Sequence, residues 1–143
     1  MSKEIKREAC NYFALRQATR AVSIIYDRHI EKAGITSTQY SILRAIHNRP
    51  GITMQELAET MVMDRTVALR AIQPLNRDGL VQLKPAPDLA RKQSLSLTKD
   101  GEAKLSEAEA HWRDAQAEFE ASFGRDEAAA LRKILLSIKS DRT

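Results

Sequence analysis

Apolar side chains recur at helical spacing near the start of the chain. Between Glu8 and Ala33 they recur every three or four positions, apart from the adjacent pair Ile25 and Tyr26, at Leu15, Ala18, Val22, Ile25, Tyr26, Ile30 and Ala33. This spacing predicts one long amphipathic helix that ends before Gly34. At 1.5 Å per residue such a helix is about 39 Å long, which is more than one small core can cover.

Two later segments have the sequence of a capping box, in which a threonine and a glutamine or glutamate each bond a backbone amide at a helix start. Thr36 is followed by Gln39, and Thr53 by Glu56. The first box predicts a helix that ends at the turn-forming residues 48–51. The second predicts a short helix over about 54–61.

A further helix is predicted to start after Asp64, which is a good N-cap residue. We expect it to bury Val67, Ala71 and Leu75, which recur every four residues. Its opposite side then carries Arg65, Thr66, Leu69, Arg70, Gln73 and Arg77. Because proline has no amide hydrogen, Pro74 should bend or end the last turn.

The period of the pattern then changes from about 3.6 to two. Residues 80–84 and 93–97 both alternate apolar with polar side chains, and 85–92 separate them. This predicts a β-hairpin with a loop longer than a tight turn. Thr98 should cap a long helix to about Phe123, and a last helix follows Gly124 over about 126–139.

The apolar stripes on the first helix and the last two exceed what one chain can cover. The last helix alone carries Ala128, Leu131, Ile134, Leu135 and Ile138. Another copy of the chain would supply the missing surface, so the pattern predicts a homodimer.

Composition narrows the class of protein. The chain has 143 residues, of which 43% are hydrophobic and 29% charged, with 5 Gly and 4 Pro. That length suits one domain with helical extensions, and so few turn residues favour a mostly helical fold. The single Cys10 excludes an internal disulfide and a multi-cysteine metal site.

The sequence also limits where we expect the protein in the cell and which chemistry we expect of it. No apolar run approaches the roughly 18–20 residues that span a membrane, and the charged first residues lack the apolar core of a signal peptide. We therefore expect a cytoplasmic protein with no membrane partner. The sequence has no glycine-rich phosphate loop, nucleophile motif or His-Glu metal signature, so we expect neither an enzyme nor a cofactor.

Charge is distributed unevenly along the chain. The net charge is +4 overall, but 65–92 carry six basic and two acidic side chains, whereas 98–128 carry four basic and nine acidic ones. A basic segment of this kind indicates an anionic partner, nucleic acid first. An ordinary solvated face is the alternative.

The order of the predicted elements favours nucleic acid. Two short helices followed at once by a small hairpin form a winged helix-turn-helix. A helix fits the major groove of about 12 Å, and a hairpin beside it can lie along the phosphates. Arg65, Arg70 and Arg77 on the second helix, and Lys84, Arg91 and Lys92 on the hairpin, suit these roles.

At this point the sequence resembles the MarR family of bacterial transcriptional regulators, over about 9–140. The similar motifs are Leu57-Ala58-Glu59, Met63-Asp64-Arg65-Thr66, Leu75-Asn76-Arg77-Asp78-Gly79-Leu80-Val81 and Leu95-Ser96-Leu97-Thr98-Lys99-Asp100-Gly101. Tyr26-Asp27, Gly34-Ile35-Thr36 and Gln39-Tyr40 also match. The resemblance implies a homodimeric repressor whose two lobes grip a pseudo-palindromic operator on double-stranded DNA.

The resemblance also implies a division of the chain and a recognition helix. Residues 1–34 and 99–143 would form interlocking dimerisation helices, and 35–98 a DNA-binding lobe with its wing at about 80–97. Arg65, Thr66, Leu69, Arg70 and Gln73 would face the groove. The family's wing-tip arginine falls on Arg91. Leu89 occupies the place of its usual acidic partner, and Asp88 lies one position away, so an Asp88–Arg91 pair is left open.

Members of the family usually release DNA when a small, often aromatic or anionic effector binds near the junction of the dimer helices and the lobe. Candidate residues are Tyr12, Arg16, Arg20, Tyr40, Arg44 and His47, since an arginine pairs bidentately with a carboxylate. The alternative is that the tyrosines are core residues and the arginines solvated charges.

Two other functions stay open at this stage. Some members sense oxidants through an N-terminal cysteine, but that place falls on Tyr12, two residues after Cys10. A helical adaptor that binds only protein would explain the long amphipathic helices, but it would not explain a basic winged hairpin.

Overall fold

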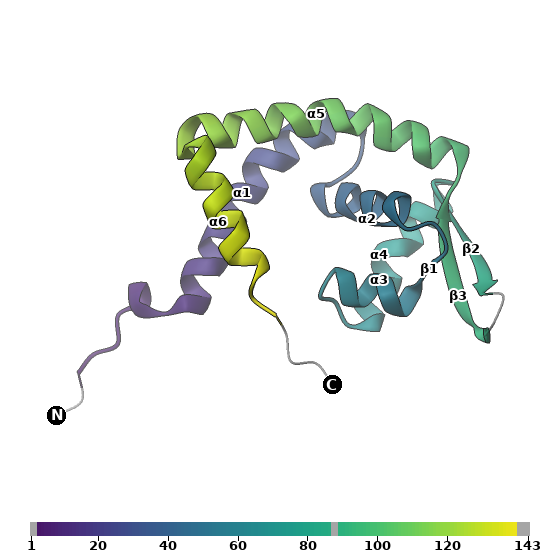
Figure 1. The fold of residues 1–143 in the computed structure, drawn as a ribbon, viewed down its shortest axis with the longest axis horizontal. Helices are drawn as coiled ribbons and strands as arrows, with labels where there is room; N and C mark the ends of the chain where they lie inside the picture. Colours follow the sequence, from purple (N-terminus) through teal and green to yellow (C-terminus); the bar gives the residue numbers. More distant parts are fainter. Residues whose placement is uncertain (1–2, 87–88, 140–143) are drawn as a thin grey trace.

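A long helix, α5 (Lys99–Phe123), joins two groups of elements (Figure 1). The computed structural model describes residues 3–86 and 89–139, and the side chains of 86–92 lie outside that description. At one end of α5 lie helix α1 (Asn11–Ile30), between single 3₁₀ turns at Arg7–Ala9 and Glu31–Ala33, and helix α6 (Arg125–Leu136). The other end carries a compact lobe.

The lobe contains three helices and a small sheet. The helices are α2 (Ser37–Asn48), α3 (Met54–Thr60) and α4 (Arg65–Arg77). The strands are β1 (Ile52–Thr53), β2 (Val81–Ala86) and β3 (Leu89–Leu97), in the antiparallel order β1-β3-β2. The fold is therefore mainly helical with a small β-wing, which confirms the predicted winged helix-turn-helix.

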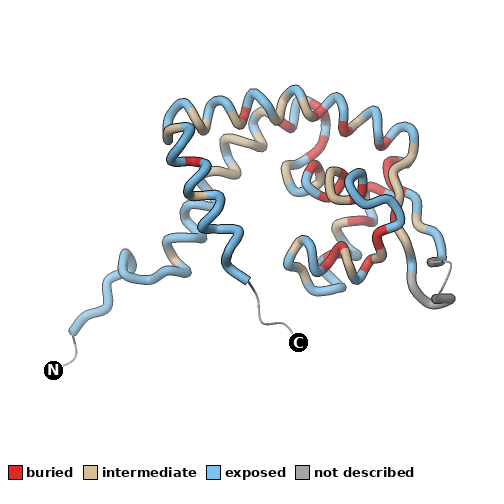
Figure 2. The backbone as a smooth tube through the Cα atoms, in the orientation of Figure 1, coloured by how far each residue is buried: buried red, intermediate tan, exposed pale blue. Residues whose placement is uncertain are grey.

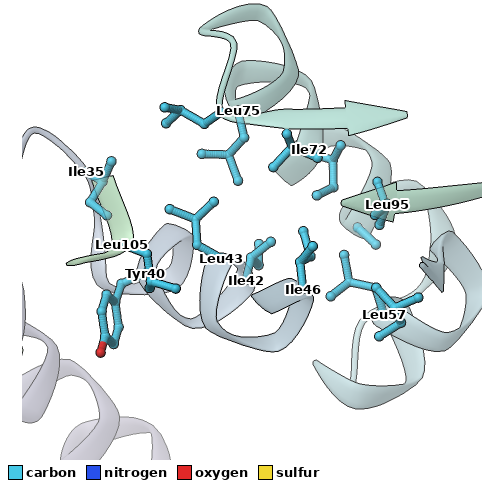
Figure 3. Close-up of a cluster of buried hydrophobic side chains, with 14 of the residues drawn as sticks. Ile35, Tyr40, Ile42, Leu43, Ile46, Leu57, Ile72, Leu75, Leu95 and Leu105 are labelled. Carbon is cyan, nitrogen blue, oxygen red and sulfur yellow. The ribbon is translucent and has the colours of Figure 1, made fainter. Parts of the chain in front are cut away.

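The hydrophobic core lies inside the lobe and under the adjoining end of α5. Leu43, Ile46, Ile72 and Leu95 have no exposed surface, and Figure 3 shows them converging from α2, α4 and β3. Leu105 of α5 closes the cluster. Figure 2 shows buried positions concentrated in the lobe, while α6 and the start of α1 are mostly exposed.

The starts of α2, α3, α4 and α5 were predicted correctly because each depends on a few adjacent residues. Both capping boxes form, with Thr36 and Gln39 at α2 and Thr53 and Glu56 at α3. The Asp64 Oδ1 atom accepts a hydrogen bond from the amide of Val67 at 2.8 Å and so caps α4. The Thr98 hydroxyl oxygen caps α5 by accepting from the amide of Gly101 at 2.9 Å.

The predicted buried face of α4 is partly wrong. The helix buries Ala68, Ile72 and Leu75, whereas Val67 is 45% exposed and Ala71 only packs against the rim of the core. A face centred on Ile72 removes more apolar surface from water than one centred on Ala71. Turning Ile72 inward carries Val67 outward, because residues five positions apart lie about 140° apart around a helix.

Pro74 does not end α4. The helix continues to Arg77, and the amide of Asp78 donates to the carbonyl of Pro74 at 2.9 Å. The missing amide hydrogen costs one bond to Arg70 and does not stop the helix.

The predicted hairpin loop is too long. β2 reaches Ala86 and β3 starts at Leu89, so most of 85–92 is strand. The register shifts beyond the Pro85–Gln93 pair, because Ala86 pairs with Leu89 and 90–92 lie between these pairs on β3. The short strand β1, which pairs with β3, was not predicted.

The first helix is shorter than the expected Glu8–Ala33. Cys10 is extended, and its Sγ lies 3.5 Å from the amide of Phe13, so the α-helix starts at Asn11. Gly34 ends the segment with a φ of 81°, as predicted. Within the described ranges, no helix is both long and apolar enough to cross a membrane.

The turn between α3 and α4 holds a strained residue. Val62 has a φ of 53°, which is unusual for a β-branched residue. Its amide donates to the carbonyl of Glu59, and that of Met63 donates to Ala58. This is the bonding of a Schellman motif, in which glycine is preferred at the position of Val62.

We predict that Val62→Gly raises the free energy of unfolding by about 0.5–1 kcal/mol, since it removes the left-handed strain and Val62 is 63% exposed. Urea unfolding at a fixed protein concentration measures the change. As a control, Thr60→Gly places glycine in the last turn of α3 and should lower stability. A loss of stability in Val62→Gly would contradict the strain.

Candidate nucleic-acid interface

The outer face of α4 is the centre of the candidate interface. Ile72 and Leu75 fix the rotation of the helix by entering the core. The six side chains predicted to face outward are all exposed, namely Arg65, Thr66, Leu69, Arg70, Gln73 and Arg77. The structure therefore gathers these predicted residues on one solvent-facing surface.

The charge on this face is positive. Arg77 forms the only ion pair found on α4 among the described residues, with Nε 3.5 Å from Oδ1 of Asp78. Both side chains are exposed, and such surface pairs contribute little, so the guanidinium stays available to an anion. Arg65 and Arg70 add two further cations to the exposed face.

The wing, formed by β2 and β3, packs beside α4. The turn at Gly79 has a φ of 76° and leads directly from the helix into β2, and α4 contacts β2. Lys84 is exposed on β2. Arg91 and Lys92 lie on β3, but their side chains are outside the described part, as is Asp88.

Sequence reasoning missed some residues of this surface. Val67 joins the exposed face of α4, for the reason given above. Gln55 and Gln93 line a small hollow of about 140 Å³ beside Arg65. Gln93 reaches it because β3 crosses the sheet between β1 and β2, and the pairing with β1 gave no signal in the sequence.

Three of the residues proposed for an effector lie together between α2 and α5. Tyr40 is buried and stacks on Trp112 with ring centroids 6.4 Å apart. Arg44 donates to the Tyr40 hydroxyl at 3.2 Å and lies 3.8 Å from Glu109. His47 Nδ1 lies 2.8 Å from Glu102. Tyr40 is thus a core residue with an arginine at its rim.

The other three, Tyr12, Arg16 and Arg20, lie in the first half of α1, away from the end of the helix that meets α2. The Arg16 guanidinium is 5.9 Å from the Tyr12 ring centroid, and Arg20 donates to Gln17 at 3.4 Å. α2 meets α1 near Asp27, whose Oδ1 accepts from the amide of Ser37 at 2.8 Å. Fifteen residues of helix, about 22 Å, separate Tyr12 from Asp27. One chain therefore does not bring the six residues into one crevice.

A wide apolar groove runs between α1, α5 and α6, with a volume of about 530 Å³. Leu15 and Val22 of α1, Phe119 of α5 and Leu131 of α6 form its walls. Tyr26 lies at its edge and donates to Gln116, and burial raises the pKa of the Tyr26 hydroxyl. The predicted apolar face of the first helix thus lines a groove that one chain leaves open.

An ionic contact ties α1 to α5. Glu118 contacts Arg28 and lies 3.2 Å from Nε2 of His29. Hydrogen bonds from His29 and then Arg28 lower the pKa of the Glu118 carboxyl. Cys10, the candidate redox residue, is exposed at the first turn of α1.

Comparison with known proteins agrees with this geometry. The model of the MarR family matches residues 33–92. The homoprotocatechuate degradative operon repressor of Escherichia coli is 30% identical over 123 residues, which are 85% of this chain and 82% of that protein.

Two solved structures are similar as well. The M. tuberculosis transcriptional regulator MosR in complex with DNA is 35% identical, with a TM-score of 0.74 over 90% of this chain and 97% of that one. PcaV from Streptomyces coelicolor, in complex with its natural ligand, shares the fold, with a TM-score of 0.84 at 20% identity over 95% of this chain and 96% of that one.

Proposed function

Because the chain belongs to the MarR family of transcriptional regulators, we propose that it represses transcription by binding a pseudo-palindromic DNA operator as a homodimer. The observation that carries this proposal is the exposed arginine face of α4, held in place by Ile72 and flanked by the wing. In the proposal, α4 enters the major groove and the wing contacts the phosphates.

The proposed division of labour follows the two groups of elements. Residues 35–98 would form the DNA-binding lobe, and 1–34 and 99–143 the dimerisation helices. The acidic stretch 98–128 then lies mainly on α5, outside α4 and the wing, the two elements that would meet the DNA. The groove between α1, α5 and α6 supports this division, because it leaves apolar walls uncovered in a single chain.

Selection from a randomised duplex pool tests the proposed operator. A twofold protein reads two half-sites whose centres are one helical turn apart, about 34–36 Å, or a multiple of it. We expect the selected DNA to contain an inverted repeat with that spacing. A single unrepeated motif would contradict the dimeric reading of DNA.

The exposed apolar side chains of α6 lead to a prediction about the dimer. Ile134 is 63% exposed and Leu136 74% exposed in the single chain. Ile134→Glu should raise the dissociation constant of the dimer at least about tenfold, since an unpaired charge is costly to bury. Sedimentation equilibrium measures this constant.

Ser106→Glu is the matched control, because it adds the same charge to an exposed position of α5. We expect that variant to dimerise normally. If Ile134→Glu also dimerises like the unmodified protein, α6 does not belong to the interface.

We also propose that a small aromatic or anionic effector releases the DNA. The E. coli relative is named for a homoprotocatechuate degradative operon. In this chain Arg44, at the rim of the Tyr40–Trp112 stack, is the cation that an aromatic acid would meet between α2 and α5. His47, which also faces α5 from α2, stays in the proposal. So do Tyr12, Arg16 and Arg20, which the assembled dimer would add.

A thermal-shift screen of aromatic acids and their thioesters tests the effector, because a ligand of the folded state raises the melting temperature. We expect at least one compound to raise it and to lower DNA binding. Arg44→Gln should abolish the shift. A compound that shifts both proteins equally would contradict the role of Arg44.

A further inference from the structure

Val67 is an apolar side chain held on the DNA-facing side of the lobe. It lies in the first turn of α4 and is 45% exposed. Its amide is fixed by the 2.8 Å bond to Asp64 Oδ1. Ala68 and Ile72, which are almost fully buried, prevent the helix from turning Val67 inward.

The position of Val67 on the helix decides what it can touch. Thr66, Arg70 and Gln73 occupy the middle of the exposed face, with Val67 on one flank and Leu69 on the other. Arg70 lies one turn after Val67 and is its neighbour on the helix surface. Because the N-terminal residues of such a helix reach the base edges, Val67 lies within the reading segment.

The chemistry of the groove limits the partner of this side chain. A branched apolar group that covers a donor or acceptor of a base would leave that polar group without water or partner, which is unfavourable. The apolar feature of the major groove is the C5-methyl group of thymine. Val67 therefore matches thymine and no other base.

We propose that Val67 is a specificity-determining residue, which packs against the C5-methyl of one thymine in each operator half-site, beside the base pair that Arg70 contacts. This inference rests on the proposed function, since it requires α4 to enter the major groove. It adds a base preference that the arginines alone do not supply.

Deoxyuridine substitution tests the contact, because deoxyuridine differs from thymidine only in lacking that methyl group. The probe is the duplex that the protein itself selects from a randomised pool, resynthesised with one deoxyuridine at a time. At one thymine per half-site we expect the affinity to fall about threefold to fivefold, as for loss of one buried methyl-sized contact. The other thymines should tolerate the change.

Variants of the protein, measured on the thymine and the deoxyuridine duplexes, complete a double-mutant cycle between Val67 and the methyl group. Val67→Ala should bind the thymine duplex more weakly by a similar factor and should show no further loss on the deoxyuridine duplex. Leu69→Ala, on the opposite flank, should keep the full response to deoxyuridine. Thermal melting checks that both variants remain folded.

The outcomes separate this inference from the function on which it rests. If duplexes are selected but no deoxyuridine lowers the affinity, or if Val67→Ala keeps the full deoxyuridine loss, Val67 does not read a thymine. The scan on the unmodified protein gives this answer even if Val67→Ala does not fold. If the protein selects no duplex, the proposed function itself fails and the inference with it.

Discussion

Ile72→Ala will lower the free energy of unfolding by about 2–5 kcal/mol. Ile72 has no exposed surface and meets Leu43, Ile46 and Leu75 in the centre of the lobe (Figure 3). Removing its side chain leaves a cavity in a packed core, which costs the lost transfer energy and the lost contacts. Urea unfolding at one fixed protein concentration measures the change.

Val67→Ala is the matched control for this prediction, because it truncates the residue that the sequence pattern wrongly placed in the core. Val67 is 45% exposed, so its truncation should cost less than about 1 kcal/mol. Equal losses in the two variants, or a larger loss in Val67→Ala, would mean that α4 is rotated differently and that the proposed DNA face is wrong.

Arg70→Ala will weaken operator binding by about 1–3 kcal/mol, a factor of about 5 to 150. Arg70 is exposed at the middle of α4, where its guanidinium can reach both acceptors on the edge of a guanine. Loss of a base contact should also relax the sequence preference at one position of each half-site. Fluorescence anisotropy on matched and single-mismatch duplexes measures both effects.

Arg113→Ala serves as the control, since it removes the same charge from α5, where Arg113 pairs with Glu109 at 3.0 Å. It should leave operator binding unchanged apart from a small electrostatic effect. If Arg70→Ala weakens matched and mismatched duplexes by the same factor, Arg70 contacts phosphate and does not read a base.

The starts of α2, α3, α4 and α5 were predictable because they are set locally. Thr36, Thr53, Asp64 and Thr98 each accept a hydrogen bond from the amide three residues later. Contacts with distant parts of the chain are not needed to fix where these helices start. The same holds for Gly34, whose left-handed backbone ends the first helical segment whatever packs around it.

The wrong predictions concern features that depend on tertiary packing and strand pairing. Spacing alone allows either Ala71 or Ile72 at the centre of the buried face of α4, and the larger side chain takes it because the core of α2 and β3 has room for it. The hairpin was misjudged for a related reason. Its strands extend through 85–92 by pairing with each other, although Pro85 and Ala86 carry no strand pattern.

The candidate interface was more predictable than the effector site. To predict the residues on one exposed face of a helix, only the helix itself has to be predicted correctly. All six residues predicted on α4 are exposed. Tyr12 and Tyr40 were grouped by the resemblance alone, and in one chain Tyr12 lies at the start of α1 whereas Tyr40 lies on α2 in the lobe. Such a grouping depends on how distant parts of the fold come together, which the order of residues does not give.

The central claim is that this regulator binds DNA through the basic face of α4 and the wing. The most direct test is fluorescence anisotropy of the full chain on its selected duplex across a salt series. Because bound cations displace counterions from phosphate, the logarithm of the affinity should fall linearly with the logarithm of salt concentration, with a slope of about −0.9 per phosphate contact. Lys84→Ala should make that slope less steep by about one unit. A slope near zero would contradict the account.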